Sequence, residues 1–237
     1  MRTCYVFDVD GTLTEARQHI SASHKAIFKD FCKNNIVYLL TGSDHPKTKE
    51  QLGCVTNSVN GSFQCGGNEY WINDKIVTTA EPFVAPLELD KFWKEKLKNS
   101  KFPLRTGMHE DYRNGLVNYS IVGRGATLGE RKLYQKWDKE TNERNQIAKD
   151  LNLLFPDYTA QVAGGTGIDV FETGKDKGQV YHILKDSYDQ IIFFGDDCQE
   201  GGNDHPFVVQ CKDPDEFNHV SGPDETFKLL EDVYESV

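Results

Sequence analysis

The sequence predicts an α/β protein, because short apolar runs that end in polar residues alternate with helical segments. Three such runs lie at residues 5–7, 36–40 and 191–194. Runs of this length, closed by turn-forming residues, are typical of buried strands. The residues that follow them are Asp8, Thr41 and, after one glycine, Asp196. In an open parallel sheet such residues face the crevice beyond the strand ends, where ligands bind.

Helical segments separate the first strands. Ile27, Phe28 and Phe31 fall at helical spacing, and Ser21 can cap a helix over residues 21–34. Residues 46–52 resume a helical composition after the second run. This strand–helix–strand order predicts a Rossmann-like core built on a parallel sheet.

The middle of the chain has a different pattern of strand-like and helical segments, which predicts an inserted domain. Residues 116–122 and 168–171 are strand-like, and about 127–154 is a charged helical stretch. Strands and a helix between two halves of a parallel sheet predict an α+β cap domain. We therefore expect a core domain over 1–81 and 179–237 and a cap domain over 82–178. The hinges are expected near Pro82–Pro86 and Gly174–Gly178.

Composition argues against several classes of protein. The formal net charge of −10 disfavours nucleic acid as the main partner, because phosphate backbones bind basic surfaces. No apolar run approaches the roughly 20 residues that a membrane span requires. A strand-like run begins directly after the first four residues, which leaves no room for a signal peptide. The six cysteines are scattered without a Cys-x-x-Cys pair, which is typical of reduced thiols, so we expect a cytoplasmic protein with no membrane partner.

The string Asp8-Val9-Asp10-Gly11-Thr12 carries the strongest chemical signal. Two carboxylates two residues apart can divide the work of phosphoryl transfer, since one can attack phosphorus while the other moves a proton on the substrate hydroxyl. Their charges would repel each other and the phosphate, so the site requires a hard cation. Mg²⁺ suits a few carboxylates together with water and phosphate oxygens. The alternative is that Asp-Gly only makes a turn and the other Asp is solvated.

The order of the downstream residues resembles the haloacid dehalogenase superfamily. Asp8 and Asp10 match its nucleophile and its acid/base, and Thr41 matches its phosphate-binding hydroxyl. Lys177 matches the lysine that neutralises the transferred phosphoryl group, and Asp196 matches the acidic magnesium ligand, with Asp197 as a neighbouring candidate. The resemblance implies a metal site of Asp8, Asp10 and Asp196. It also implies an enzyme that passes through an aspartyl-phosphate on Asp8.

Further strings are similar to the eukaryotic-type phosphomannomutase family. They are Asp8 to Gln18, Thr41 to Asp44 with Lys49 to Gly53, Arg113-Asn114-Gly115, Gly123-Arg124, Glu130-Arg131, Gly164-Gly165 with Asp169-Val170-Phe171 and Asp176-Lys177, and Phe193 to Asp196 with Gly201 to His205. The resemblance implies Mg²⁺-dependent interconversion of mannose 1-phosphate and mannose 6-phosphate, with a hexose bisphosphate as activator. A homodimer formed through the cap is also expected.

A mutase binds its sugar phosphate in two orientations, so the phosphate that does not react needs a charged cradle of its own. Guanidinium groups suit this because they bind phosphate bidentately and do not deprotonate. The resemblance implies that Arg113, Arg124 and Arg131 form this cradle. Asp169 would accept from sugar hydroxyls, and Arg17 would reach the substrate from the core side.

The loop before Asp169 departs from the family pattern. One residue is missing after Gly164-Gly165, and Gly167 stands where the family has a substrate-contacting serine. This departure favours a sugar-phosphate phosphatase of the same superfamily, in which water resolves the intermediate, whereas the three cap arginines favour the mutase. A catalytically silent sugar-phosphate-binding module is a second alternative, and the intact nucleophile and lysine argue against it.

Overall fold

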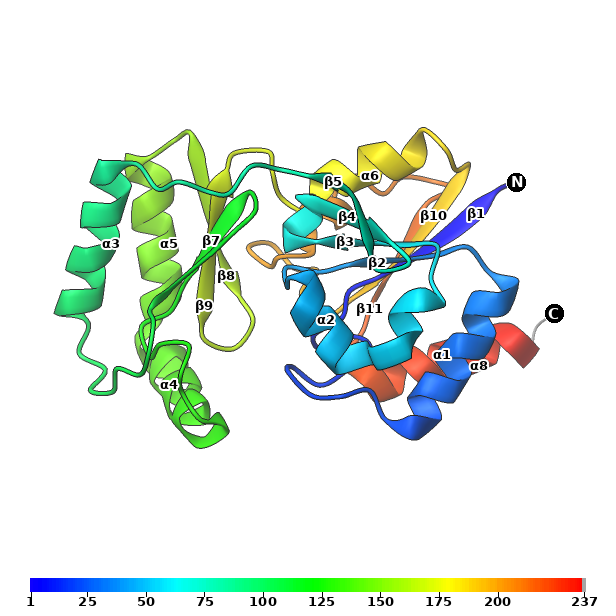
Figure 1. Ribbon diagram of the computed structural model, residues 1–237, viewed down its shortest axis with the longest axis horizontal. Helices are drawn as coiled ribbons and strands as arrows, with labels where there is room; N and C mark the ends of the chain where they lie inside the picture. The colour runs from blue at the N-terminus through cyan, green and yellow to red at the C-terminus, as the bar shows by residue number, and fades with distance from the viewer. Residues whose placement is uncertain (236–237) are drawn as a thin grey trace. The chain divides into compact units, whose positions relative to one another are not determined.

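The computed structural model describes residues 1–235, and the chain forms two compact units. Unit 1 consists of Met1–Thr79 and Asp176–Val237, and unit 2 is the inserted segment Ala80–Lys175. The insertion thus covers 80–175 where the sequence pattern suggested 82–178, so Lys177 belongs to unit 1. Each unit has its own sheet, as Figure 1 shows, and side chains of each unit form its own apolar core.

Unit 1 is built on a seven-stranded sheet with the order β11-β10-β1-β2-β3-β4-β5. Its strands are β1 (Thr3–Phe7), β2 (Val37–Leu40), β3 (Gly61–Gln64), β4 (Glu69–Ile72), β5 (Lys75–Thr79), β10 (Gln190–Gly195) and β11 (Glu216–His219). The pairs from β11 to β3 are parallel, and β3-β4-β5 are antiparallel. The three expected strands are β10, β1 and β2, which lie side by side, so the predicted parallel core is confirmed.

Helices cover both faces of this sheet. They are α1 (Ala22–Asn34), α2 (His45–Leu52), α6 (Gly178–Lys185), α7 (His205–Val208) and α8 (Pro223–Glu235), with short 3₁₀ turns at Gly53–Asn57 and Cys65–Gly67. Figure 1 shows α1 and α8 on one face and α6 on the other. Alternation along β1 explains the two layers, because Phe7 packs on Phe28 of α1 whereas Cys4 and Val6 share a cluster with Val180 of α6.

Unit 2 is a four-stranded antiparallel sheet with the order β6-β7-β9-β8 and helices on one face (Figure 1). Its elements are α3 (Leu87–Asn99), β6 (Glu110–Arg113), β7 (Leu116–Tyr119), α4 (Leu128–Thr141), α5 (Glu143–Leu154), β8 (Tyr158–Ala163) and β9 (Gly167–Glu172). Its core brings together Trp93 of α3, Tyr119 of β7 and Tyr134 of α4. The Trp93 and Tyr119 rings stack with their centroids 4.4 Å apart.

Some elements differ from the sequence expectation. The charged stretch over 127–154 is two helices, because Asn142 adopts a left-handed φ of 57° and ends α4. The expected strand over 116–122 ends at Tyr119. The hairpin β4-β5 was not predicted, since all five residues of Lys75–Thr79 are exposed and no buried alternation marks that strand.

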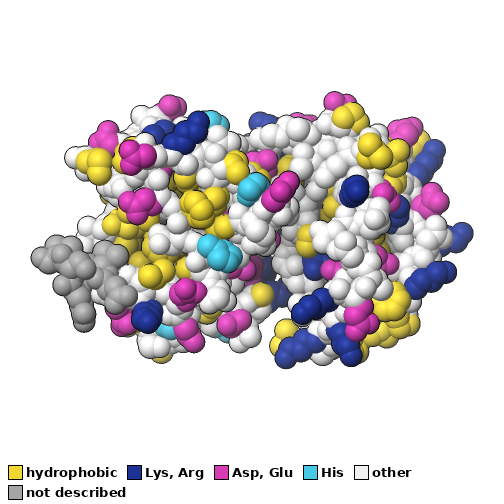
Figure 2. Space-filling view, turned by 180° about the vertical axis from the view of Figure 1, so that it is seen from behind, with side chains coloured by type: hydrophobic (Ala, Val, Ile, Leu, Met, Phe, Trp, Pro, Cys, Tyr) yellow, Lys and Arg dark blue, Asp and Glu magenta, His cyan; other side chains and the backbone are white. Residues whose placement is uncertain are grey.

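None of the described helices is long and apolar enough to cross a membrane. Figure 2 shows basic and acidic side chains interspersed on one face of the molecule.

Candidate active site

Three carboxylates converge beyond the carboxyl ends of the central strands of unit 1. Asp8 follows β1, Asp196 follows β10, and Asp204 lies directly before α7. One carboxylate oxygen of each lies within 4.8 Å of those of the other two. Asp8 and Asp204 are buried, at 3% and 0% exposed. The group is therefore a set of hard oxygen donors held largely out of water.

The turn after β1 depends on Gly11. Its φ of 91° lies in the left-handed region that favours glycine. A Cβ at this position would also overlap with the carboxylate of Asp196. The glycine therefore lets the chain turn and lets Asp196 approach the end of β1.

Lys177 joins two members of the carboxylate group. Its Nζ donates to Oδ1 of Asp8 and to Oδ1 of Asp204, each at 2.6 Å, and its side chain is 3% exposed. Burial alone would lower the pKa of Lys177, but the charges of Asp204 and Asp8 more than offset burial and raise it. The lysine is therefore a permanent buried cation beside the predicted nucleophile.

One ammonium does not balance three carboxylates. If all were ionised, three negative charges and one positive charge would leave two negative charges in the group. Burial raises the pKa of Asp8 well above its usual range, although the charge of Lys177 opposes the shift. Burial and the nearby Asp204 raise the pKa of Asp196 to about 7. A divalent cation with oxygen ligands would neutralise this excess charge, so the residues fit Mg²⁺.

Asp10 lies outside that carboxylate group. Its Oδ1 accepts from the backbone N of Arg17 at 2.8 Å and from Gln51 at 2.9 Å. Its Oδ2 accepts from Lys47 Nζ at 2.8 Å and from Ser43 Oγ at 3.1 Å. Burial opposes ionisation, but Lys47 and the other donors lower the pKa of Asp10 to about 2. As placed, Asp10 is an ionised carboxylate turned toward α2.

Thr41 and Arg17 lie near this arrangement. Thr41 follows β2 and is 1% exposed, and its Oγ1 accepts from the backbone N of Ser43 at 3.1 Å. Arg17 has a left-handed φ of 61°, and its backbone binds Asp10. Of the expected residues in unit 1, the structure brings Asp8, Asp196 and Lys177 together. The third carboxylate of the group belongs to Asp204, whereas the sequence had suggested Asp10.

In unit 2 an acidic side chain holds two of the expected arginines. Asp111 Oδ2 accepts from Arg113 Nη2 at 2.6 Å and Nε at 3.2 Å. The same oxygen accepts from Arg124 Nη2 at 2.8 Å. Arg131 lies on α4, one turn after its Thr127 cap, and is 9% exposed. The structure therefore brings Arg113 and Arg124 together around one anion.

Asp169 and Gly167 lie on β9, beside Asn118 of β7. Asn118 donates to Asp169 Oδ1 at 2.6 Å and accepts from Arg124 Nη1 at 3.0 Å. A Cβ on Gly167 would overlap with the Asn118 amide. Four of the expected residues of unit 2, Arg113, Arg124, Gly167 and Asp169, thus belong to one contiguous polar surface.

Several residues of these sites were missed by sequence reasoning. They are Ser43, Lys47, Gln51, Asp111, Asn118 and Asp204. Ser43, Gln51 and Asp204 lie inside strings that resemble the family, so those strings could have drawn attention to them. Asp111 lies two residues before Arg113, and strand alternation could have placed both on one face.

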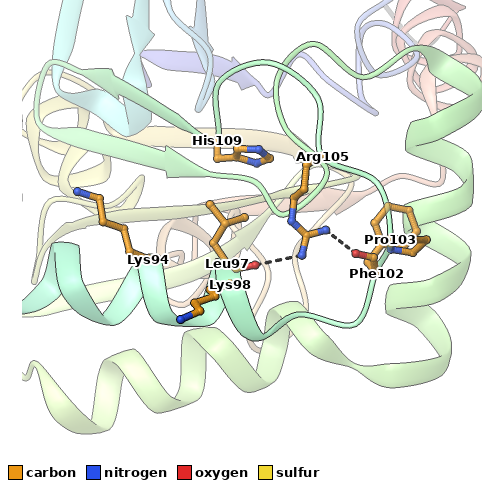
Figure 3. A pocket seen from close by; sticks show the side chains of 7 residues that line it. All are labelled: Lys94, Leu97, Lys98, Phe102, Pro103, Arg105 and His109. Carbon is orange, nitrogen blue, oxygen red and sulfur yellow. Dashed lines mark hydrogen bonds between the residues drawn. The ribbon is translucent and has the colours of Figure 1, made fainter.

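An open pocket of about 460 Å³ lies elsewhere in unit 2. Its lining residues are Lys94, Leu97, Lys98, Phe102, Pro103, Arg105 and His109 (Figure 3). Arg105 donates to the backbone carbonyls of Leu97, Ser100, Phe102 and Leu104, which cluster around the end of α3. This guanidinium therefore caps the helix, and none of the expected site residues lines the pocket.

Comparison with known proteins identifies the family. Residues 25–236 match the family described as eukaryotic phosphomannomutase. A phosphomannomutase of Saccharomyces cerevisiae is 33% identical over 244 residues, which cover 98% of this chain and 94% of that protein. A probable phosphomannomutase of Caenorhabditis elegans is also 33% identical and covers 98% of this chain and 95% of that protein.

Solved structures share the fold at low sequence identity. The C-terminal domain of a Candida albicans trehalose-6-phosphate phosphatase has a TM-score of 0.65 at 14% identity, covering 97% of this chain and 90% of that chain. A haloacid dehalogenase-like hydrolase from Bacteroides thetaiotaomicron has a TM-score of 0.57 at 12% identity, covering 98% and 100%. The expected fold, a parallel-sheet core with an inserted α+β domain, is thereby confirmed. By its sequence match over nearly the whole length, the chain is an enzyme of the eukaryotic phosphomannomutase family.

Proposed function

We propose that the protein interconverts mannose 1-phosphate and mannose 6-phosphate through a phosphorylated Asp8. The observation that carries the proposal is the ion pair of Asp8 with Lys177 inside a buried carboxylate group, at the carboxyl end of a central parallel strand. A carboxylate placed this way can act as a nucleophile whose product remains paired with a cation. Relatives that span the same length are named phosphomannomutases.

The residues of unit 1 divide the chemistry. A carboxylate oxygen of Asp8 forms a bond to phosphorus while the bond from phosphorus to the sugar oxygen breaks. Asp10, which is ionised as placed, takes the proton of the substrate hydroxyl that attacks the phosphorylated Asp8, and it returns that proton to the sugar oxygen when the phosphoryl group moves back to Asp8. Lys177 stabilises negative charge on the transferred group, and Thr41 donates to a phosphate oxygen.

The carboxylates of Asp8, Asp196 and Asp204 are the side chains that would hold Mg²⁺, while Asp10 contributes through its proton transfer. When bound, the ion offsets the two uncompensated negative charges and allows a phosphate to approach. This assignment replaces the expected ligand Asp10 with Asp204, because only the latter has a carboxylate oxygen within the group.

Unit 2 serves as the cap that recognises the phosphate that does not react. Arg113, Arg124 and Arg131 bind that phosphate, and Asp169 accepts from sugar hydroxyls. Arg17 of unit 1 contacts the substrate near Asp10. A hexose bisphosphate activates the enzyme by phosphorylating Asp8.

We also propose that the protein is cytoplasmic and forms a homodimer through unit 2. Unit 2 exposes large apolar side chains at Met108, Leu128, Leu133 and Leu153, with exposures of 71%, 64%, 57% and 81%. Light scattering of the full chain tests the dimer. The double variant Leu128→Glu, Leu133→Glu should be monomeric if these leucines, which share helix α4, lie in the interface.

A sugar-phosphate phosphatase is the alternative, and the altered loop at Gly164–Asp169 favours it. The deciding assay supplies mannose 1-phosphate with a catalytic amount of hexose bisphosphate and follows both mannose 6-phosphate and free phosphate. We expect more isomerised sugar than free phosphate per turnover. Predominant phosphate release without bisphosphate-dependent isomerisation would refute the mutase and leave the phosphatase.

A further inference from the structure

We propose that Asn118 is a positioning residue of the phosphate-binding surface of unit 2, where its amide aligns Arg124 with Asp169, and that glycine stands at position 167 to make room for that amide. The inference rests on the proposed function, because it takes Arg124 and Asp169 to contact the sugar phosphate.

Asn118 occupies the middle of a polar row that crosses the sheet of unit 2. It is directly opposite Asp111 of β6 on one side and Asp169 of β9 on the other. Its chain neighbours Val117 and Tyr119 are buried in the apolar core. Because side chains alternate along a strand, Asn118 points to the face opposite that core. The residues opposite it in the neighbouring strands share that face.

The partners of the Asn118 side chain leave one orientation for its amide. Nδ2 donates to the Asp169 carboxylate at 2.6 Å, and Oδ1 accepts from the Arg124 guanidinium at 3.0 Å. Rotating the amide by half a turn would set its NH₂ against a donor and its oxygen against an acceptor, so both bonds would be lost. Asn118 is 5% exposed, so water would not readily replace them. The amide therefore links a cation and an anion in a defined geometry.

Gly167 lies against this amide. A Cβ at position 167 would overlap with Nδ2 of Asn118 and would lie 3.1 Å from its Cγ. The backbone at this point is anchored, because Arg144 Nη1 donates to the carbonyls of Gly164 at 2.7 Å and Gly167 at 3.3 Å. Arg144 is itself held by Asp138 through Nε at 2.8 Å. A serine at 167 would therefore displace the Asn118 side chain rather than the strand.

This arrangement explains why a glycine stands at position 167. The position has no room for a side chain, because the Asn118 amide occupies the space where a Cβ would lie. Gly167 and the amide of Asn118 are therefore coupled. A side chain at position 167 or a change of Asn118 should disturb the same contacts of Arg124 and Asp169.

A double-mutant cycle tests that coupling. Asn118→Ala, Gly167→Ser and their combination are made in the full chain, and KM and kcat for mannose 1-phosphate are measured. A phosphate bound equally in the ground and transition states affects KM alone, so each single substitution should raise KM about tenfold and leave kcat within about threefold. With Asn118→Ala present, Gly167→Ser should add less than about threefold, because the displaced side chain is gone. The remaining close contact is with the Ala163 carbonyl, 3.0 Å from the new Cβ.

Controls separate positioning from folding. Asn145 is an exposed asparagine of the same unit, so Asn145→Ala should match the wild type in KM, kcat and melting temperature. Asn118→Ser takes the place of Asn118→Ala if the alanine variant does not melt cooperatively. A lowered kcat or melting temperature with an unchanged KM would show a merely structural role and overturn the inference.

Two further outcomes are distinguishable. KM effects that multiply fully in the double variant, or a wild-type KM for Asn118→Ala, would overturn the inference while leaving the proposed function intact. A wild-type protein that accepts phosphate from acetyl phosphate but does not isomerise mannose 1-phosphate would contradict the proposed function instead. In that case the Kd of mannose 6-phosphate is measured by calorimetry for the wild type, the two single variants and the double variant. We expect the two substitutions to affect Kd less than multiplicatively, as they would affect KM.

Discussion

Two aspartates separated by one residue lie in opposite electrostatic surroundings. Burial among other carboxylates raises the pKa of Asp8, with Lys177 opposing the shift. For Asp10 the hydrogen bonds and the charge of Lys47 outweigh burial and lower the pKa to about 2. Neighbouring carboxylates whose pKa values are shifted in opposite directions can take different roles in one reaction. The proposed nucleophile Asp8 must be ionised to attack, which the charge of Lys177 favours, and Asp10, ionised as placed, must take up a proton before it can act as the acid.

We expect Asp8→Asn to abolish phosphorylation of the protein by acetyl phosphate, because an amide cannot form an acyl-phosphate. Asp10→Asn should still accept phosphate from this donor, whose leaving group needs little protonation, but should fail to turn over sugar phosphates. Intact-mass analysis follows the phosphorylated protein. Asp30→Asn, an exposed site on α1, is the control and should behave as the wild type. Labelling of the Asp8 variant at the wild-type rate would end the covalent hypothesis.

A buried aspartate far from the site should make the stability of unit 1 depend on pH. Burial opposes ionisation of Asp215, but hydrogen bonds from Lys185, Tyr181 and the backbone N of Ile191 lower its pKa below the usual value. A lowered folded-state pKa gives stability that is present above the unfolded pKa of about 3.9 and is lost as pH falls through the folded value.

Asp215→Asn should therefore lower the free energy of unfolding at pH 7 by about 1–3 kcal/mol. The difference from the wild type should shrink as the pH falls below about 4. Urea unfolding at several pH values measures it. A difference that stays constant down to acid pH would show that the charge of Asp215 contributes nothing.

At the scale of elements, parallel pairing gathers the reactive groups. β1 and β10 are parallel neighbours in which Phe7 lies beside Phe194. The residues that follow both strands therefore emerge at the same edge of the sheet, although they are far apart in sequence. In unit 2 the antiparallel pair β7-β9 sets Asn118 opposite Asp169 in the same way. Strand register thus decides which side chains can act together.

The two units should be separable by their effects on catalysis. Arg124→Ala removes a charge-assisted phosphate contact, so sugar phosphate binding should weaken by about 1.5–3 kcal/mol. Acetyl phosphate does not require the distal cradle, so its labelling of Asp8 should be nearly unchanged. Lys132→Ala, which removes an exposed cation of α4, is the matched control and should change neither quantity. A parallel fall in labelling and sugar turnover would instead assign Arg124 to stability or to the site of unit 1.

At the scale of the whole molecule, unit 2 is continuous in sequence and unit 1 is not. Unit 2 has its own apolar core, which includes Trp93 and Tyr119. In unit 1, β1 lies between β2 from the first segment and β10 from the second. Each cross-strand pair of β1 with β10 therefore requires the chain on both sides of the insertion.

We expect residues 80–175 to fold alone and residues 1–79 to remain unfolded alone. A sheet that lacks β10 leaves one side of β1 unpaired and part of its core open to water. Circular dichroism melting of the two segments, with the full chain as control, tests this. A cooperative melt of 1–79, or none for 80–175, would contradict the expectation.

Local patterns were enough to predict the α/β class, the central strands and the family, because buried apolar runs and short motifs can be recognised without knowing which distant segments meet. Asp8 and Lys177 were found in this way, and the structure joins them at 2.6 Å. Two groupings could not be predicted in this way: Asp204, rather than Asp10, lies with Asp8 and Asp196, and Asn118 fills the space beside Gly167. They depend on strand register and side-chain direction between segments far apart in the chain, which no local pattern specifies.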